Sequence, residues 1–228
     1  LNTLLKSTAE LIGRARIQAG NVAHGLKTPL AVLTDEAYQI KEQGLHQSAA
    51  TILDQCRKMQ TQIDYQITRA RAVAMRSAPG MVASVQKAAL EVASALSRLH
   101  KARPISIETN IPPSVSVACD AQDLNEMIAN LVDNACKHAR KRVGISLAQP
   151  SQQDRVTVAV EDDGAGLPPE AYEIVFNVGE RWDSQKPGSG LGMAIVRDLA
   201  RLYGGDVRLG SSTYGGLAVY LELPKATQ

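Results

Sequence analysis

The chain has 228 residues, of which 44% are apolar and 21% charged, a composition typical of globular proteins rather than disordered or fibrous ones. The 25 basic residues nearly balance the 23 acidic ones, and no basic stripe with interleaved aromatic residues occurs, which argues against nucleic-acid binding. The three widely spaced cysteines make neither a disulfide framework nor a metal-binding spacing, so we expect buried thiols in a reducing compartment.

Two long helices are predicted at the start of the chain. Apolar residues recur at steps of three, four or seven over residues 3–42 and again from Ser48 to about Arg76, and Gly44 lies between them as a helix stop. A helical hairpin of this kind leaves an apolar stripe on each arm, which a second copy of the chain would cover in a four-helix bundle. We therefore expect residues 1–76 to form a homodimer.

Residues 77–80 predict a linker, and the pattern beyond it predicts a second domain over residues 81–228. The order of elements indicates an α+β fold with one mixed sheet and helices on one face. Asp120 is the expected N-cap of the central helix. Helices are expected at 81–102, 121–139, 169–176 and 190–203, and strands at 105–109, 115–118, 142–147, 156–161, 206–210 and 216–223.

His24 lies in the string NVAHGLKTPLAVL, residues 21–33. Val22 and Leu26 belong to the apolar stripe, so we expect His24 to face solvent, with Thr28 one turn further along the same face. A neutral imidazole carries a nucleophilic nitrogen near pH 7. On this residue alone, a solvated surface histidine without a chemical role is the alternative interpretation.

Three strings in the second domain suit nucleotide binding. NLVDNACKHA places Asn130, Asn134 and Lys137 on one helix face, where an amide oxygen suits Mg²⁺ and a lysine suits phosphate, although an ordinary polar helix face explains them equally well. EDDGAG puts Asp163 after a strand, and KPGSGLG precedes a helix, so both permit close backbone approach and the second offers N–H groups for phosphate.

HGLKTPL resembles the phosphoacceptor box of sensor histidine kinases, most nearly their PhoQ-like branch. The downstream strings resemble the ATP-binding fold shared by histidine kinases, Hsp90, gyrase and MutL. The resemblance implies that His24 is phosphorylated from ATP·Mg²⁺, that Asp163 binds the adenine amino group, and that Asn134 ligates Mg²⁺. It further implies that Asn130, Lys137, His138, Gly164, Gly166, Arg181, Lys186, Gly188, Gly190, Leu191 and Gly192 line the nucleotide site, with Phe176 as an aromatic residue of its lid.

The same resemblance implies that phosphohistidine passes its phosphoryl group to an aspartate of a response regulator, and that Thr28 orients water for the reverse hydrolysis. Lys137 and the lid cations would neutralise phosphate charge. The amide of Asn130 replaces the glutamate with which the ATP-hydrolysing relatives activate water, so transfer to a protein nucleophile is favoured over hydrolysis.

Gly25 departs from the family pattern, because most members carry Glu or Asp directly after the histidine. The glycine weakens the helix by about 1 kcal/mol relative to alanine, and either local pliancy or close packing explains it. The alternative hypothesis is therefore a phosphotransfer and phosphatase scaffold with weak or no autokinase activity, acting through Thr28.

The chain opens at LNTLLKS with a helical pattern and no initiating methionine. No apolar run reaches the roughly 18 residues that a membrane-spanning helix needs. We expect the chain to be the cytoplasmic portion of a longer protein, anchored in the bacterial inner membrane through segments outside it.

Overall fold

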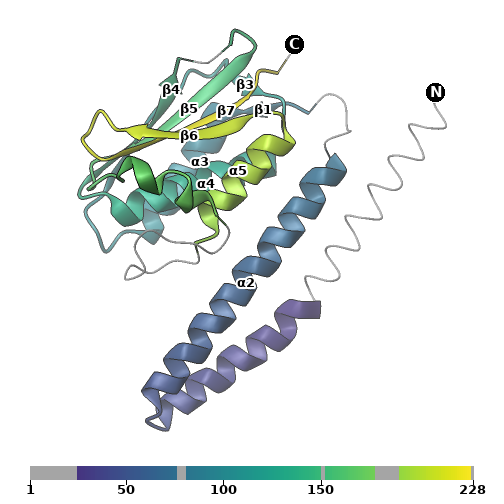
Figure 1. Cartoon of the computed structure of the whole chain (residues 1–228), viewed down its shortest axis with the longest axis vertical. Coiled ribbons are helices and arrows are strands. Elements are labelled where there is room, and N and C mark those ends of the chain that lie inside the picture. The colour runs from purple at the N-terminus through teal and green to yellow at the C-terminus, as the bar shows by residue number, and fades with distance from the viewer. Residues whose placement is uncertain (1–24, 76–80, 150–151, 178–189, 227–228) are drawn as a thin grey trace, which may run out of the picture. The chain divides into compact units, whose positions relative to one another are not determined.

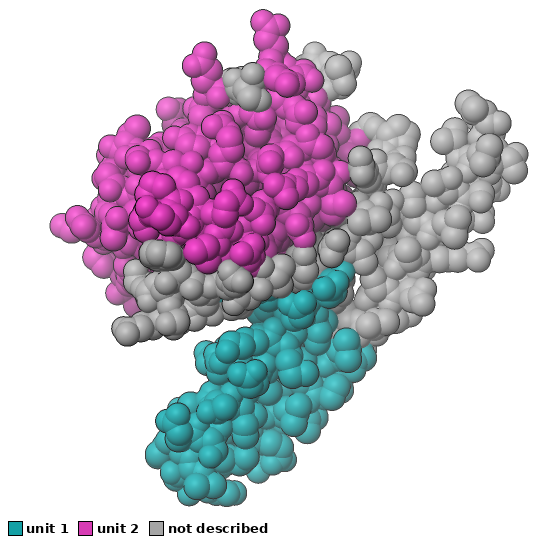
Figure 2. All heavy atoms as spheres, viewed as in Figure 1, with its two compact units in different colours: residues 1–77, 187–191 teal, residues 78–186, 192–228 magenta. Residues whose placement is uncertain are grey.

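The computed structural model describes residues 25–75, 81–149, 152–177 and 190–226. It divides into two compact units, the first comprising residues 1–77 and 187–191 and the second residues 78–186 and 192–228 (Figure 2).

The first unit contains a hairpin of two helices, over residues 25–42 and α2 (His46–Met75) (Figure 1). Gly44, with φ +87°, ends the first helix as predicted, because the left-handed conformation cannot continue a right-handed helix. Ala37 of the predicted stripe is buried, whereas Leu26 and Leu33 are exposed on the single chain. The predicted residues 3–24 lie outside the described part of the chain.

The second unit is built on a five-stranded mixed sheet in the order β2-β4-β5-β7-β6. β2 runs parallel to β4, and the other neighbours are antiparallel. A small antiparallel sheet pairs β1 with β3, and Val117 of β3 bridges to Lys225, just beyond the end of β7. The strands are β1 (Ala83–Ser84), β2 (Ser106–Asn110), β3 (Ser116–Val117), β4 (Arg142–Ala148), β5 (Arg155–Asp162), β6 (Asp206–Ser211) and β7 (Leu217–Pro224).

Helices α3 (Val85–Leu99), α4 (Ala121–His138) and α5 (Gly192–Leu202) cover one face of this sheet (Figure 1). Asp120 caps α4 as predicted, because its Oδ1 accepts from the N–H groups of Gln122 at 2.8 Å and Asp123 at 3.2 Å. The apolar side of α4 packs into the core, and this packing fixes the position of the opposite, polar side of the helix. The wholly buried side chains of α4 include Leu124, Met127, Ile128, Leu131 and Val132.

Three predicted elements differ from the structure. The helix predicted at 81–102 is shorter, since residues 83–84 pair with β3 and the Ser84 hydroxyl caps α3. The helix predicted at 169–176 is two 3-10 turns, η1 (Pro169–Ala171) and η2 (Ile174–Phe176). α5 begins at Gly192 rather than at 190, because Gly190 has φ +71°.

All three cysteines are free and buried, as expected from the sequence. Within the described residues, no helix combines the length and apolarity needed to cross a bilayer.

Candidate functional site

The polar face of α4 faces the start of α5. The Asn130 Nδ2 donates to the Glu126 carbonyl at 2.9 Å, one turn earlier on the helix. The Asn130 Oδ1 lies against Gly192, where an added Cβ would come within 3.1 Å of it. Asn134, one turn further along α4, is half-buried. α4 and the first residue of α5, which are distant in sequence, therefore adjoin.

Lys137, predicted to bind phosphate, forms an ion pair within its own helix. Its Nζ lies 2.5 Å from the Asp133 Oδ2, and the Asp133 Oδ1 lies 2.9 Å from the His100 Nε2. One carboxylate thus bridges the lysine and the imidazole. Asp133 and His100 were not predicted from the sequence, although an acidic residue four positions before a lysine on a helix is a recognisable signal for Asp133.

The C-terminal end of α4 is held by Arg103. Its Nη1 donates to the Cys136 carbonyl at 2.7 Å and to the Lys137 carbonyl at 3.2 Å, and its Nη2 donates to the Ala139 carbonyl at 2.6 Å. A cation here satisfies carbonyls that the helix leaves unpaired and opposes the negative end of its dipole. Arg103 therefore fixes the backbone that carries Lys137, a role without a local sequence signal.

Asp163, predicted to bind adenine, accepts hydrogen bonds from backbone N–H groups of the turn that follows α4. Its Oδ1 accepts from the N–H groups of Arg140 at 2.8 Å, Lys141 at 3.0 Å and Arg142 at 3.1 Å. Its Oδ2 also accepts from the Lys141 N–H at 3.1 Å. Desolvation acts to raise the pKa of this carboxyl, but the backbone hydrogen bonds outweigh it and hold the pKa below its usual value.

Asp162, the preceding residue, is buried with 3% of its surface exposed. Its Oδ1 accepts from the Gly164 N–H at 2.8 Å and the Leu217 N–H at 3.3 Å. An added Cβ at Gly164 would lie 2.8 Å from this oxygen, and one at Gly216 only 2.2 Å, so neither position accommodates a side chain. The backbone is packed closely around a carboxylate that the sequence analysis passed over.

Strand alternation could have identified Asp162. Val158 and Val160 of β5 are buried, and Asp162 shares their parity, whereas Glu161 and Asp163 alternate with it. Because successive residues of a strand point to opposite faces of the sheet, assigning adenine binding to Asp163 instead of Asp162 chooses a side chain on the opposite face.

Gly164 and Gly192, one from each predicted glycine string, lie against α4. An added Cβ at Gly164 would lie 2.5 Å from the carbonyl oxygen of the exposed His138, so EDDGAG abuts the end of the helix. Gly166 and Gly190 both have φ +71°, a conformation that favours glycine. Leu191 and the lid aromatic Phe176 are buried.

Thr28 lies exposed on the helix over residues 25–42. No described atom lies within 4 Å of a Cβ built on Gly25. The predicted residues His24, Arg181, Lys186 and Gly188 lie outside the described part of the chain. Among the described residues, no group of three or more His, Cys, Asp or Glu side chains could hold a metal ion. Asn130 and Asn134 of α4 have amide oxygens, which are hard donors.

Comparison with known proteins agrees with this geometry. Residues 119–227 match the family described as histidine kinase-, DNA gyrase B-, and HSP90-like ATPase. The chain is 34% identical over 224 residues to the sensor protein kinase CarS of Pseudomonas aeruginosa, covering 98% of this chain and 49% of CarS. It is 33% identical over 221 residues to the sensor protein PhoQ of Escherichia coli K12, covering 95% of this chain and 44% of PhoQ. The chain thus spans about half the length of the curated relatives it matches.

Two solved structures place the fold in the same group. The mycobacterial sensor histidine kinase MprB aligns with a TM-score of 0.57 and 27% identity, covering 65% of this chain and 99% of that one. Full-length ShkA in complex with AMPPNP aligns with a TM-score of 0.67 over 92% of this chain and 46% of ShkA, at an identity of 23% that supports the fold alone.

Proposed function

The chain belongs to the family of sensor histidine kinases and carries their ATPase domain, and we propose that it is a kinase core that phosphorylates its own His24 from ATP. The observation that carries this proposal is that Gly164, whose N–H donates to the buried Asp162 carboxylate, and Gly192 both lie against α4. The phosphoryl group then passes to an aspartate on a response regulator, which is a separate protein.

In this proposal Asp162, rather than Asp163, accepts the hydrogen bond from the adenine amino group. Both oxygens of Asp163 already accept from the backbone of residues 140–142, which makes that carboxylate a support for the turn after α4. Asp162 is buried on the helix-covered side of β5, and closely packed glycine backbone around it suits a planar base.

The amide of Asn134 suits Mg²⁺, with Asn130 beside it, because Mg²⁺ prefers hard oxygen ligands. When bound, the ion neutralises charge on the phosphates of ATP. Lys137 supplies a point charge at the exposed end of the same face once ATP phosphate competes with Asp133 for its ammonium group. His138, Gly164, Gly166, Gly190, Leu191 and Gly192 line the site in this proposal, as do Arg181, Lys186 and Gly188.

The reaction we propose is an in-line phosphoryl transfer. A neutral imidazole nitrogen of His24 attacks the γ-phosphorus, a nitrogen–phosphorus bond forms, and the bond to the bridging oxygen of the leaving ADP breaks. Asn130 cannot act as a base toward water, and its amide already donates to the Glu126 carbonyl, which supports transfer to histidine over hydrolysis. The protein contributes positioning and charge neutralisation.

We propose dimerisation through residues 1–76. Leu26, Leu33 and Met59 of the hairpin have 44%, 48% and 52% of their surfaces exposed. Large apolar side chains on a two-helix hairpin are the kind that a second hairpin covers in a four-helix bundle. Because the relatives are about twice as long, we also propose that the chain is the cytoplasmic portion of a membrane-anchored sensor.

The labelling test uses the full chain with γ-³²P-ATP and Mg²⁺. The proposal requires label that is stable to base and labile to acid, and its loss in His24→Gln with ATP binding retained. His46→Gln, a substitution of the exposed histidine at the start of α2, is the matched control and keeps the label. Persistence of label in His24→Gln would refute the assignment.

A second candidate function, a phosphatase scaffold, is favoured by one observation. Gly25 takes the place of the acidic residue that most members of the family carry directly after the histidine. The exposed Thr28 would then orient water for hydrolysis of a phosphorylated regulator. Regulator dephosphorylation that is unchanged in Thr28→Ala would eliminate this candidate.

A further inference from the structure

The turn between β6 and β7, residues 212–216, contacts the buried Asp162 at the end of β5. The Gly216 N–H donates to the Asp162 carbonyl at 3.1 Å, and the Leu217 N–H, directly after the turn, donates to the Asp162 Oδ1 at 3.3 Å. A Cβ added at Gly216 would lie 2.2 Å from the same Oδ1. The position of the turn therefore affects how the Asp162 carboxylate is oriented.

Glu161 holds the same turn from the opposite face of the sheet. It alternates with Asp162 along β5, so its side chain lies on the face that the helices leave uncovered (Figure 1). Its Oε1 accepts from the Thr213 N–H at 2.8 Å and from the Thr213 hydroxyl at 3.1 Å. One carboxylate oxygen thus receives two donors from a single residue of the turn.

Tyr214, the next residue of the turn, packs on the same face as Glu161. A Cβ added at Gly144, which pairs with Glu161 across the sheet, would lie 2.6 Å from the Tyr214 hydroxyl oxygen, so the ring covers a strand position that has no side chain. The guanidinium carbon of Arg142 lies 4.2 Å from the centre of this ring. The turn is therefore held to the uncovered face at two consecutive residues, Thr213 and Tyr214.

Hydrogen bonds within the turn make it move as a unit. The Ser212 N–H donates to the Gly216 carbonyl and the Gly215 N–H donates to the Ser212 carbonyl, both at 3.0 Å. The Ser212 hydroxyl accepts from the Tyr214 N–H at 2.9 Å. A shift of Thr213 on one face of the sheet is therefore passed to Gly216 on the other.

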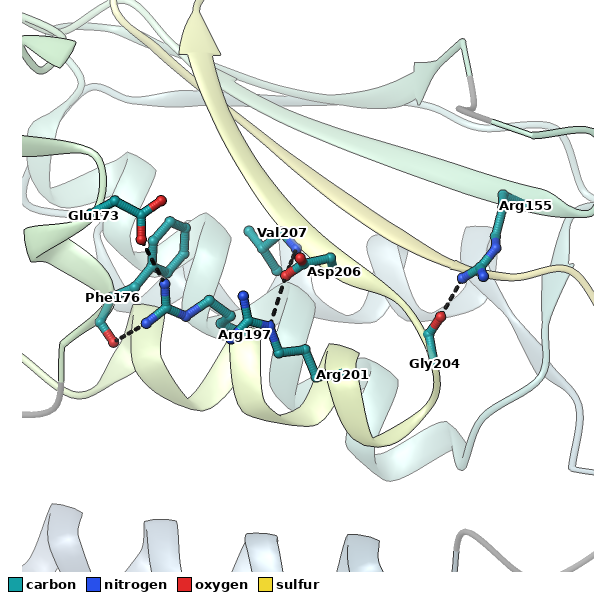
Figure 3. Close-up of polar contacts among 8 residues, drawn as sticks. All are labelled: Arg155, Glu173, Phe176, Arg197, Arg201, Gly204, Asp206 and Val207. Atoms are coloured by element: carbon teal, nitrogen blue, oxygen red, sulfur yellow. Dashed lines mark hydrogen bonds and ion pairs between the residues drawn. The ribbon is translucent and has the colours of Figure 1, made fainter.

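The other end of the β6–β7 hairpin is held independently of Glu161. The Nε of Arg201, on α5, lies 3.2 Å from the Oδ1 of Asp206, the first residue of β6 (Figure 3). Arg155 of β5 donates to the Gly204 carbonyl, just before β6 begins (Figure 3). Between the two ends, β6 pairs with β7 along its whole length. Removing the Glu161 carboxylate should therefore loosen the turn and leave the strands in place.

We propose that Glu161 is a positioning residue for adenine: by holding Thr213, it keeps the 212–216 turn where the Leu217 N–H orients the Asp162 carboxylate toward the adenine amino group. The inference rests on the proposed function, since it takes Asp162 as the acceptor of that amino group. It assigns a role to a carboxylate on the face of the sheet opposite the nucleotide.

The test compares the affinities of the full chain for ATP·Mg²⁺ and ITP·Mg²⁺, measured by isothermal titration. Hypoxanthine, the base of ITP, carries a carbonyl oxygen where adenine carries the amino group, so the ratio of the two affinities reports on the contact with Asp162. In Glu161→Ala we expect this ratio to fall about fivefold through weaker ATP binding, with ITP affinity within about twofold of wild type. A general loss of structure would weaken both nucleotides alike.

Glu222→Ala is the matched control, because Glu222 lies on the same face of the sheet, near the other end of β7, and accepts from the Thr157 hydroxyl at 3.2 Å. This variant should keep the wild-type ratio. Glu161→Gln retains an oxygen acceptor for Thr213, and its ratio should stay within about 1.5-fold of wild type. Should Glu161→Ala fail to fold by circular dichroism, Thr213→Val removes the hydroxyl hydrogen bond alone, and the ratio should fall about two- to threefold.

Each remaining outcome has a defined meaning. An unchanged ratio in the folded Glu161→Ala or Thr213→Val chain, or an equal fall in Glu222→Ala, overturns the inference alone. A wild-type chain that binds ATP and ITP equally well overturns the adenine contact at Asp162, and the inference with it. A wild-type chain that binds no ATP overturns the proposed function itself.

Discussion

The assignment of adenine to Asp162 can be tested with a pair of isosteric substitutions, Asp162→Asn and Asp163→Asn. The Asp162 Oδ1 accepts from two backbone N–H groups, Gly164 and Leu217. An asparagine must keep its oxygen there, which turns its NH₂ group toward the position of the adenine amino group. Two donors would then face each other, and the hydrogen bond to a charged acceptor, about 1.5–3 kcal/mol, is lost. ATP affinity should fall about 10- to 150-fold.

Asp163→Asn should behave in the opposite way. It retains an oxygen acceptor but loses the charge that strengthens the hydrogen bonds from residues 140–142. We expect the free energy of unfolding to drop by about 1–2 kcal/mol, with the melting temperature lowered by roughly 2–8 °C. ATP affinity, measured by isothermal titration, should remain within about twofold of wild type.

The pH dependence of unfolding separates the two carboxylates further. Because the folded-state pKa of Asp163 lies below its usual value, its contribution to stability is complete above the unfolded pKa of about 4 and is lost as pH falls through the lower folded pKa. Asp163→Asn should therefore flatten the acid side of the stability curve. Loss of ATP binding in Asp163→Asn, with normal binding in Asp162→Asn, would refute the reasoning.

Three further outcomes are expected. Asp133→Asn releases Lys137 from its ion pair and should tighten ATP binding by about twofold, or 0.5 kcal/mol, in the same titration; weaker binding would mean that Asp133 orients the lysine instead. Arg103→Met leaves carbonyls at the end of α4 without a donor and should cost about 2–3 kcal/mol of stability in urea unfolding, and an unchanged midpoint would contradict the capping role. Gly25→Ala should raise stability by up to about 1 kcal/mol by the same method, because alanine favours the helix more than glycine does; destabilisation would show that the glycine is required.

Elements with strong local signals were predictable from the sequence. Asp120, a capping side chain directly before an apolar period, marks the start of α4, and Gly44 marks the end of the first helix. The order of helices and strands also gave the mixed sheet with helices on one face, which the structure confirms. The cap at Asp120 and the helix end at Gly44 depend on residues within one or two turns of each other, so they can be predicted from one sequence without an alignment.

Features that depend on distant residues were not predictable in this way. Arg103 reaches the carbonyls of α4 from more than thirty positions away, and the pairing of β1 with β3 shortens α3 through a contact that no local pattern encodes. The adjacent carboxylates Asp162 and Asp163 are a different case: Asp162 is the last residue of β5 and is buried, whereas Asp163 is the first residue beyond it. Asp162 shares the parity of the buried Val158 and Val160, and this is part of the basis for proposing it in place of Asp163.

The most direct test of the central claim, that this chain moves the γ-phosphoryl group of ATP onto its own histidine, is to locate the modified residue. After incubation with ATP·Mg²⁺, tandem mass spectrometry at neutral pH should find a single phosphorylated side chain, His24, and none when Asn134→Ala replaces the wild type. Phosphate on a serine, a threonine or another histidine, or an unmodified chain that nonetheless binds ATP, would contradict the account.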